Sequence, residues 1–143
     1  MQNSFWKLTL VAMTLSVPAT TLAQGNPAAP FAGGKTVTLA EAVKMAPQED
    51  KTLAPLAKAA DAAEAKLKKS PKDAAAKKAY VEAAYKFGYG AEYSSVLGAK
   101  VKYRAALAMY RKALAVDPKH EPSLKEKKQI DDIYKNMPGG VPK

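Results

Sequence analysis

The segment 103–118, YRAALAMYRKALAVDP, limits the fold of this chain more than any other stretch. Its apolar residues recur at steps of three and four, which places them along one side of an α-helix. They are Tyr103, Ala106, Leu107, Tyr110, Ala113 and Leu114. Small and large side chains alternate on that side, so a second helix can pack closely against it. Asp117 and Pro118 end the helix, because proline disfavours helical geometry at the preceding residue.

Composition favours a helical protein. The chain has 143 residues, which suits one domain, and alanine is abundant while β-branched residues are sparse after Val43. It contains no cysteine, which excludes disulfides, thiolate metal sites and cysteine nucleophiles. The formal net charge of +10, from 23 basic and 13 acidic residues, favours contact with anions. Nucleic acid, acidic lipid headgroups, cell-wall polymers and acidic proteins all meet that description.

Residues 1–23 have the layout of a secretory signal peptide. Lys7 precedes the apolar run LTLVAMTLSV at 8–17, Pro18 breaks the run, and small residues follow up to Ala23. Ten apolar residues are too few for a membrane span, which needs about 20. We therefore expect export to the periplasm or beyond the cell, with cleavage after Ala23 and no transmembrane segment afterwards. Cleavage removes one charge and leaves +9. Export makes intracellular nucleic acid an unfavoured partner.

Residues 24–50 are predicted to be a linker rich in Pro, Gly and Ala that ends in a short helix. Thr38 and Glu41 have the spacing of a capping box, and the helix after them is expected to stop before Pro47. The stretch 29–36, APFAGGKT, fits a relaxed phosphate-loop pattern. It lacks the strand before it and the helix after it that such a loop requires, so no nucleotide or other cofactor is expected.

Residues 51–87 are predicted to form two helices, as the first part of a helical domain at 51–137. Leu53, Leu56, Ala60, Ala63 and Leu67 step by three and four and define the seam of the first helix, 52–69. Ser70 is expected to cap the second helix, with Pro71 at its first position. The inward side of that helix is expected to carry Ala76, Tyr80, Ala83, Ala84 and Phe87.

The segment 103–118 resembles the second helix of a tetratricopeptide repeat (TPR). In that family a small residue, an aromatic, Ala-Leu and proline follow one another at fixed spacing. Ala106, Tyr110, Ala113-Leu114 and Pro118 match it. Leu67 and Pro71 repeat the leucine and proline at the end of this motif with the same spacing, but the motif's alanine is absent. The resemblance implies an all-α fold of antiparallel helical hairpins, with about four helices after the signal and the linker.

The same resemblance implies that the repeat's first helix ends at Gly88, eight residues after the large residue Tyr80. The small residue that should follow five positions later is matched only by Ala106, so the repeat carries an insertion of thirteen residues at 88–100. Gly88 and Gly90 argue against a continuing helix. Tyr89 and Tyr93 in the insertion suit contact with a peptide or a sugar. The favoured alternative is that they fold back, with Val96 and Leu97, to plug the end of the core.

The rest of the chain is predicted to be a charged terminal helix and a frayed tail at 138–143. The helix carries a narrow stripe of apolar residues, Leu124, Ile130, Ile133, Tyr134 and Met137. His120 is expected to be solvated, and the paired acids 49–50 and 131–132 are interpreted as surface or helix-start residues. No nucleophile is paired with a base and no metal ligands converge, so the chain is interpreted as non-enzymatic.

Three functions compete at this point. The first is an exported TPR-like scaffold that binds a protein or peptide, with a core completed by extra helices or by a second copy of the chain. The resemblance carries the groove of the family onto Lys78, Glu82, Tyr85 and Lys86, and the insertion adds Tyr89 and Tyr93. The alternative is a basic envelope protein that binds anionic polymers or lipid headgroups non-specifically. An enzyme that uses the tyrosines of the insertion is the least favoured, because no base is supplied.

Overall fold

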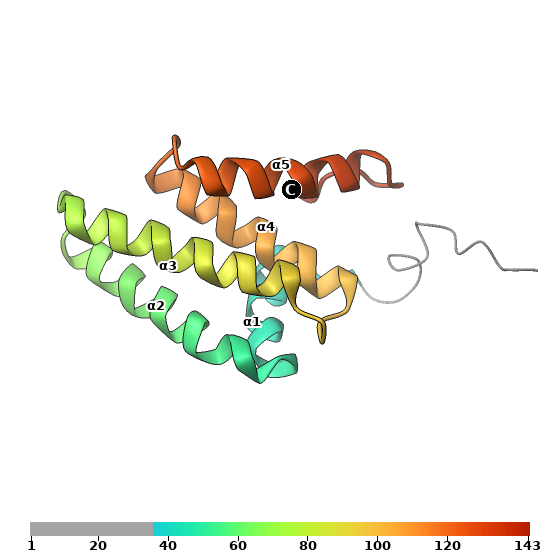
Figure 1. The fold of residues 1–143 in the computed structure, drawn as a ribbon, viewed down its shortest axis with the longest axis horizontal. Coiled ribbons are helices and arrows are strands. Elements are labelled where there is room, and N and C mark those ends of the chain that lie inside the picture. Colours follow the sequence, from blue (N-terminus) through green and yellow to red (C-terminus); the bar gives the residue numbers. More distant parts are fainter. Residues whose placement is uncertain (1–35) are drawn as a thin grey trace, which may run out of the picture.

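The computed structural model describes residues 36–143, which form a helical array with no strand (Figure 1). The all-α prediction is confirmed for this part of the chain. The predicted signal peptide and most of the predicted linker lie outside the described residues. The helices are α1 Leu39–Glu49, the 3-10 turn η2 Lys51–Leu53, α2 Ala54–Lys69, α3 Ala74–Tyr93, α4 Ala99–Val116 and α5 Glu121–Lys135.

Helix α1 begins at the predicted capping box. The Glu41 amide donates to Thr38 Oγ1 at 3.1 Å, and the Thr38 amide donates to Glu41 Oε2 at 2.8 Å. The helix continues through Pro47 to Glu49, so the predicted stop before Pro47 is wrong. Ala46 is fully buried and α1 packs along α4, which outweighs the one backbone hydrogen bond that proline lacks near the end of a helix.

Helix α2 follows a side-chain cap on η2. Asp50 accepts hydrogen bonds from the Thr52 amide and hydroxyl, at 3.0 and 2.6 Å. Its other oxygen accepts from the Ser94 hydroxyl at 2.6 Å, which ties the start of α2 to the end of α3. These hydroxyl donors, Ser94 first, lower the pKa of Asp50. The predicted seam of α2 is confirmed, because Leu53, Ala60 and Ala63 are buried and Leu56 and Leu67 are partly buried.

Helix α3 differs from the prediction at both ends. Its N-cap is Asp73, whose carboxylate accepts from the Ala75 amide at 2.8 Å, whereas Ser70 ends α2. At the other end the helix passes through both glycines and stops at Tyr93, so the prediction that the helix breaks at these glycines is wrong, and the connection to α4 is limited to residues 94–98. A side chain at Gly88 would meet Tyr110 Cε1 at 2.8 Å, and one at Gly90 would meet Leu53 Cδ2 at 2.9 Å. The glycines therefore permit close helix packing rather than breaking the helix.

Helix α4 lies at the centre of the array, and α3 makes its most extensive helix pair with it. It ends at Asp117, as predicted, and its seam residues Ala106, Leu107, Tyr110 and Ala113 are fully buried. Two apolar clusters lie along it. The larger joins it to α1, α2 and α3, and the smaller joins it to α5 through Ile130 and Tyr134.

Consecutive long helices run antiparallel, so the turns alternate between the two ends of the molecule (Figure 1). The turns 70–73 and 117–120 lie at one end. The connection 94–98 lies at the other, where the C-terminal tail also lies against residues 36–39 and the first turns of α4. This arrangement places one long side of α3 beside α5.

Candidate functional site

The six residues singled out from the sequence lie on one side of α3. Lys78, Glu82, Tyr85, Lys86, Tyr89 and Tyr93 are spaced by three, four or seven positions, and we call this surface the tyrosine face. At 1.5 Å per residue, the face extends about 22 Å along the helix. Because α3 continues through Gly88, the two tyrosines predicted in a loop are aligned with the four residues that the resemblance suggested.

The three tyrosines of this face form a ladder of rings. The ring centroids of Tyr85 and Tyr89 are 5.8 Å apart, and those of Tyr89 and Tyr93 are 4.5 Å apart. Tyr89 and Tyr93 keep 43% and 53% of their surface exposed. The alternative that they plug the core is therefore wrong for the tyrosines and for Val96, and correct for Leu97, which is buried.

The inner end of the ladder is held by the core and by the turn before α5. The Tyr85 ring lies 6.0 Å from the ring of Tyr110 and 5.4 Å from that of His120. His120 is not solvated as predicted. Its side chain is 11% exposed, its Nδ1 lies 2.8 Å from Ser123 Oγ, and its Nε2 lies 3.6 Å from Glu82 Oε1. Its position just before α5 turns the ring inward, which sequence spacing did not reveal.

Two buried carboxylates lie beneath the outer end of the ladder, and neither was singled out from the sequence. Glu92 accepts a hydrogen bond from the Tyr110 hydroxyl at 2.6 Å and lies 3.4 Å from Gln129 Nε2. Glu126 on α5 accepts from the Tyr93 hydroxyl at 3.1 Å. Helical spacing places Glu92 in line with Tyr85 and Glu126 in line with Ile130, but it does not show that either carboxylate is buried.

Burial raises the pKa of Glu92, with a further contribution from the nearby charge of Glu126, while the hydrogen bond from Tyr110 opposes both. Burial also raises the pKa of the Tyr110 hydroxyl, and partial desolvation together with the hydrogen bond to Glu126 raises the pKa of the Tyr93 hydroxyl. The tyrosines are therefore hydrogen-bond donors to carboxylates at neutral pH. Within 36–143, no group of three or more metal-ligating side chains comes together.

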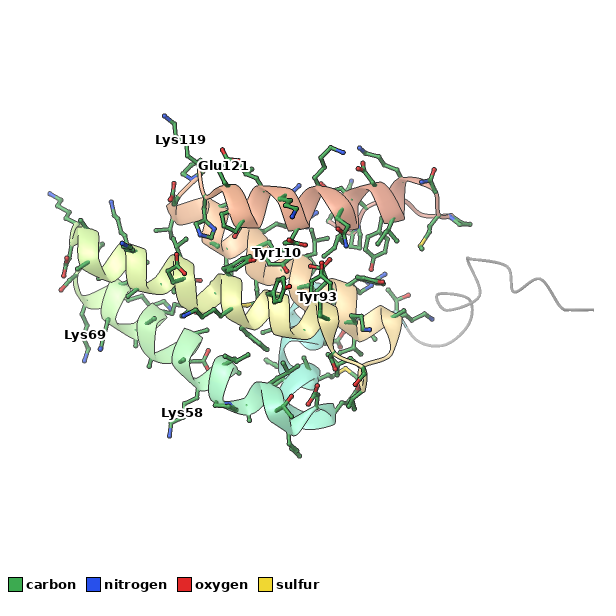
Figure 2. The ribbon with its side chains drawn as sticks, viewed as in Figure 1. Lys58, Lys69, Tyr93, Tyr110, Lys119 and Glu121 are labelled. Atoms are coloured by element: carbon green, nitrogen blue, oxygen red, sulfur yellow. The ribbon has the colours of Figure 1, made fainter. Side chains whose placement is uncertain are left out.

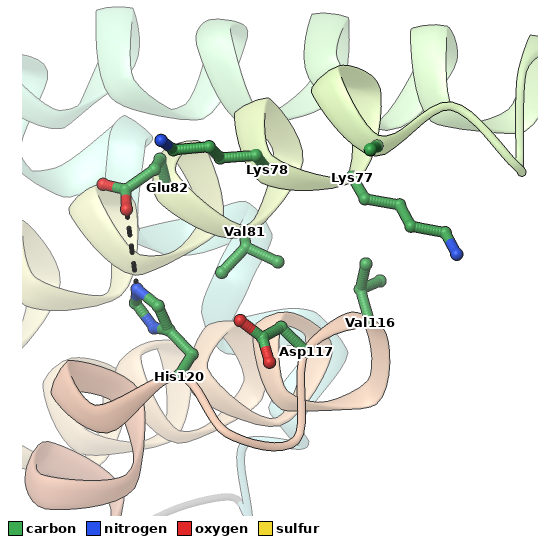
Figure 3. A pocket seen from close by; sticks show the side chains of 8 residues that line it. Lys77, Lys78, Val81, Glu82, Val116, Asp117 and His120 are labelled. Carbon is green, nitrogen blue, oxygen red and sulfur yellow. Dashed lines mark ion pairs between the residues drawn. The ribbon is translucent and has the colours of Figure 1, made fainter.

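A cavity of about 430 Å³ lies at the other end of the tyrosine face, between α3 and the turn 117–120 (Figure 3). Val81 and Val116 form its apolar part. Lys78, Glu82 and Asp117 are at its polar edge, and His120 approaches Glu82 across it. A volume of 300–1,000 Å³ is typical of sites that enclose a small ligand or a side chain. Two of the six predicted residues, Lys78 and Glu82, line this cavity.

Lys86 is exposed and lies beside the tyrosines without joining their ring contacts. Other basic residues lie at the end of the molecule that carries the turns 70–73 and 117–120, where Figure 2 shows Lys69 and Lys119 on opposite edges. Lys66, Lys68 and Lys69 belong to the last turn of α2, and Lys119 follows α4. We call these four residues the basic end. Lys68 pairs with Glu64 at 2.9 Å, so part of its charge is balanced.

No family model, curated protein or solved structure matches the chain. Among residues 36–143, no helix has the length and apolar character needed to cross a bilayer.

Proposed function

We propose that the protein is an exported, TPR-like helical scaffold that binds a protein or peptide segment through the tyrosine face and carries out no catalysis. The observation that supports this most directly is that all six candidate residues lie along one side of α3. This side borders a partly apolar cavity at one end and carries two exposed tyrosines at the other. Exposed aromatic groups of this kind are a mark of interaction surfaces.

The dimensions of the face suit an extended peptide. At about 3.3 Å per residue, a strand-like segment of six or seven residues covers the roughly 22 Å from Lys78 to Tyr93. The cavity at Val81 and Val116 accepts an aliphatic side chain of the partner. Tyr89 and Tyr93 offer ring surface for apolar contact and hydroxyl groups for the partner's backbone. Lys86 and Glu82 flank the path with one charge of each sign.

The family part of the proposal is supported by the hairpin of α3 and α4. The resemblance matched Gly88 to the glycine of the first helix, which in this chain lies inside α3, and Tyr110 to the aromatic position of the second helix. A side chain added at Gly88 would meet Tyr110 Cε1 at 2.8 Å, so the two positions are in close contact. Helices α1, α2 and α5 cover the other surfaces that a lone hairpin would expose.

The basic end favours a second function, binding of anionic envelope polymers or lipid headgroups without sequence or shape selection. Three lysines at the end of α2 and Lys119 after α4 lie at this end, in a mature chain of net charge +9. Such binding depends on the number of charges more than on their positions, and it weakens steeply with salt.

One pull-down experiment separates the two functions. The mature protein is immobilised and exposed to an envelope fraction at increasing salt, beside the variants Tyr89→Ser/Tyr93→Ser and Lys66→Gln/Lys69→Gln. If the tyrosine face binds the partner, a discrete protein is retained at about 150 mM salt, where surface charges are screened beyond about 8 Å. The tyrosine variant then loses that protein and the lysine variant keeps it. Retention by the tyrosine variant and loss by the lysine variant would instead support the polyanion function.

Export is tested separately by fractionation and N-terminal sequencing. The proposal expects the protein in the periplasm or the medium with Gln24 as its first residue. Recovery from the cytoplasm with residues 1–23 still attached would overturn this part.

A further inference from the structure

A second cavity, of about 290 Å³, lies at the opposite end of the molecule from the basic end. It is enclosed by residues just before α1, the first turns of α4, the end of α5 and the C-terminal tail. Lys100 and Arg104 come from α4, Lys143 comes from the tail, and Thr38 and Tyr134 bring hydroxyl groups. Among the described residues that line this cavity, no side chain is a carboxylate.

A hydrogen bond to the backbone fixes the position of one cationic side chain of this cavity. Arg104 is anchored because its Nη1 donates to the carbonyl oxygen of Val37. Its Nε is enclosed and has no hydrogen-bond partner among the described residues. A buried donor without a partner is rare in folded proteins and calls for an explanation, such as a water or an ion at the site. Tyr134 also interacts with the guanidinium, so the donor capacity that the described residues leave unsatisfied is that of Nε.

The backbone of the C-terminal tail also shapes the cavity. The tail turns at Gly139 and Gly140, whose φ angles of 97° and 63° favour glycine, and this brings the tail against the cavity. Arg111 Nη2 donates to the carbonyl of Pro142 at 2.6 Å and fixes the tail there.

We infer that this cavity is a binding site for a phosphate group. A phosphate needs several donors that converge from different directions, and arginine supplies a planar fork that matches its oxygens. Arg104, Lys100 and Lys143 supply cationic donors from two separate parts of the chain. A volume of about 290 Å³ exceeds the roughly 30 Å³ share of a liquid water several-fold, so a phosphate fits with a small substituent. This site is separate from the tyrosine face and does not depend on peptide binding.

The test compares two double variants that each remove two positive charges. Lys100→Gln/Lys143→Gln alters the cavity, and Lys58→Gln/Lys125→Gln alters exposed lysines that belong neither to the cavity nor to the basic end (Lys58 is labelled in Figure 2). Inorganic phosphate is titrated into the full mature chain in chloride buffer, with the backbone amides of Gly139 and Gly140 followed by NMR. We expect the dissociation constant to rise about tenfold or more in the cavity variant, since hydrogen bonds to charged groups are the stronger class. In the control variant it should change by less than about twofold, because distant exposed charges are screened.

A second arm asks which source supplies the phosphate. Vesicles of phosphatidylcholine, with and without phosphatidylglycerol, are sedimented with the same proteins. Binding of inorganic phosphate that fails only in the cavity variant supports the site and indicates a soluble phosphate. Binding only to phosphatidylglycerol vesicles, with the same pattern among variants, supports the site and indicates a lipid headgroup. Equal weakening in both double variants, or no binding of either probe, overturns the inference.

Arg104→Lys keeps the positive charge and removes the planar guanidinium, so it should also weaken phosphate binding. Circular dichroism checks that each variant folds.

Discussion

The two sides of α4 are built from different chemistry. Toward α1, α2 and α3 its neighbours are alanines, glycines and a few large apolar residues, and Phe87 and Met109 are almost fully buried. Toward α5 the core is smaller, and Ser123, Glu126 and, from α3, Glu92 are buried beside it. The first side is stabilised mainly by close apolar packing and has one buried carboxylate, Asp50, at the end of the molecule where α2 starts. The second side combines a smaller apolar core with two buried carboxylates, Glu92 and Glu126, and their hydrogen bonds. The tyrosine face lies at the border between the two.

The difference between the two sides indicates which helices are the more stable. Apolar burial needs no partner of fixed geometry, while a buried carboxylate is costly unless its hydrogen bonds are made. We therefore expect α3 and α4 to form the stable platform and α5 to be the more easily released element. Tyr93 hydrogen-bonds Glu126 on α5, so the exposed end of the ladder is linked to that element.

The largest effect is expected from Phe87→Ala on the apolar side. Phe87 is 2% exposed and lies in the larger cluster. Truncation of a buried phenylalanine lowers the free energy of unfolding by about 3–5 kcal/mol, because it removes apolar burial and leaves a cavity. Urea denaturation followed by circular dichroism measures it. A loss below about 1 kcal/mol would show that this side is loosely packed.

Gly88→Ala should lower the free energy of unfolding by a smaller amount. The new Cβ would lie 2.8 Å from Tyr110 Cε1 and 3.2 Å from Met109 Cβ, so α3 or α4 has to shift. Overpacking of this kind costs about 1–3 kcal/mol, partly offset by roughly 1 kcal/mol of helix propensity. Gly98→Ala is the matched control, because nothing lies within 4 Å of its Cβ position. If both variants are equally stable, the close approach of α3 and α4 is not a constraint.

Tyr110→Phe removes one hydrogen bond on the α5 side and leaves the ring in place. Its hydroxyl donates to Glu92 Oε2 at 2.6 Å, and both groups are buried. Loss of the donor leaves a buried carboxylate oxygen without this partner, which costs about 1–3 kcal/mol of unfolding free energy. Tyr89→Phe, at an exposed ring, is the control and should be close to neutral. A neutral Tyr110→Phe would mean that water replaces the donor, and that the polar side is open to solvent.

The smallest effect is a pH dependence from Glu92. The pKa of Glu92 is raised in the folded protein, mainly by burial, so the folded state holds this proton more tightly than the unfolded chain. Its contribution to stability is greatest below the unfolded glutamate pKa of about 4.3 and declines as pH rises toward the folded value. The stability of Glu92→Gln relative to the parent should therefore increase from acid to neutral pH. Urea denaturation midpoints of the variant and the parent, measured across this pH range, give the relative stability. Glu49→Gln serves as a control at an exposed glutamate. A stability of Glu92→Gln that falls relative to the parent as pH rises would contradict the expectation.

The parts of the fold that depend only on neighbouring residues in the sequence could be predicted. The capping box at Thr38, the seam of α2 and the stop at Asp117 all depend on neighbours in sequence, and the structure confirms them. The end of α3 was not predictable in this way. A glycine in a helix costs about 1 kcal/mol, but close packing against another helix outweighs that cost, and the sequence does not reveal the neighbour.

The same distinction between local signals and contacts from other helices applies to the candidate site. The six residues of the tyrosine face could be named from spacing and from the family resemblance, although the helix break expected at Gly88 and Gly90 was wrong. Glu92 and Glu126 could not be recognised as buried, because a charged residue is expected at the surface unless its partners are known. Those partners, Tyr110 on α4 and Tyr93 on α3, come from other helices.

Native-state hydrogen exchange tests the difference between the two sides most directly. The backbone amides around Phe87 on α3 and Met109 on α4 should exchange only through global unfolding. The amides around Glu126 and Ile130 on α5 should exchange at a lower opening free energy, because α5 is released while the α3–α4 platform stays folded. Equal opening free energies for α5 and for the platform, both matching global unfolding, would contradict the account.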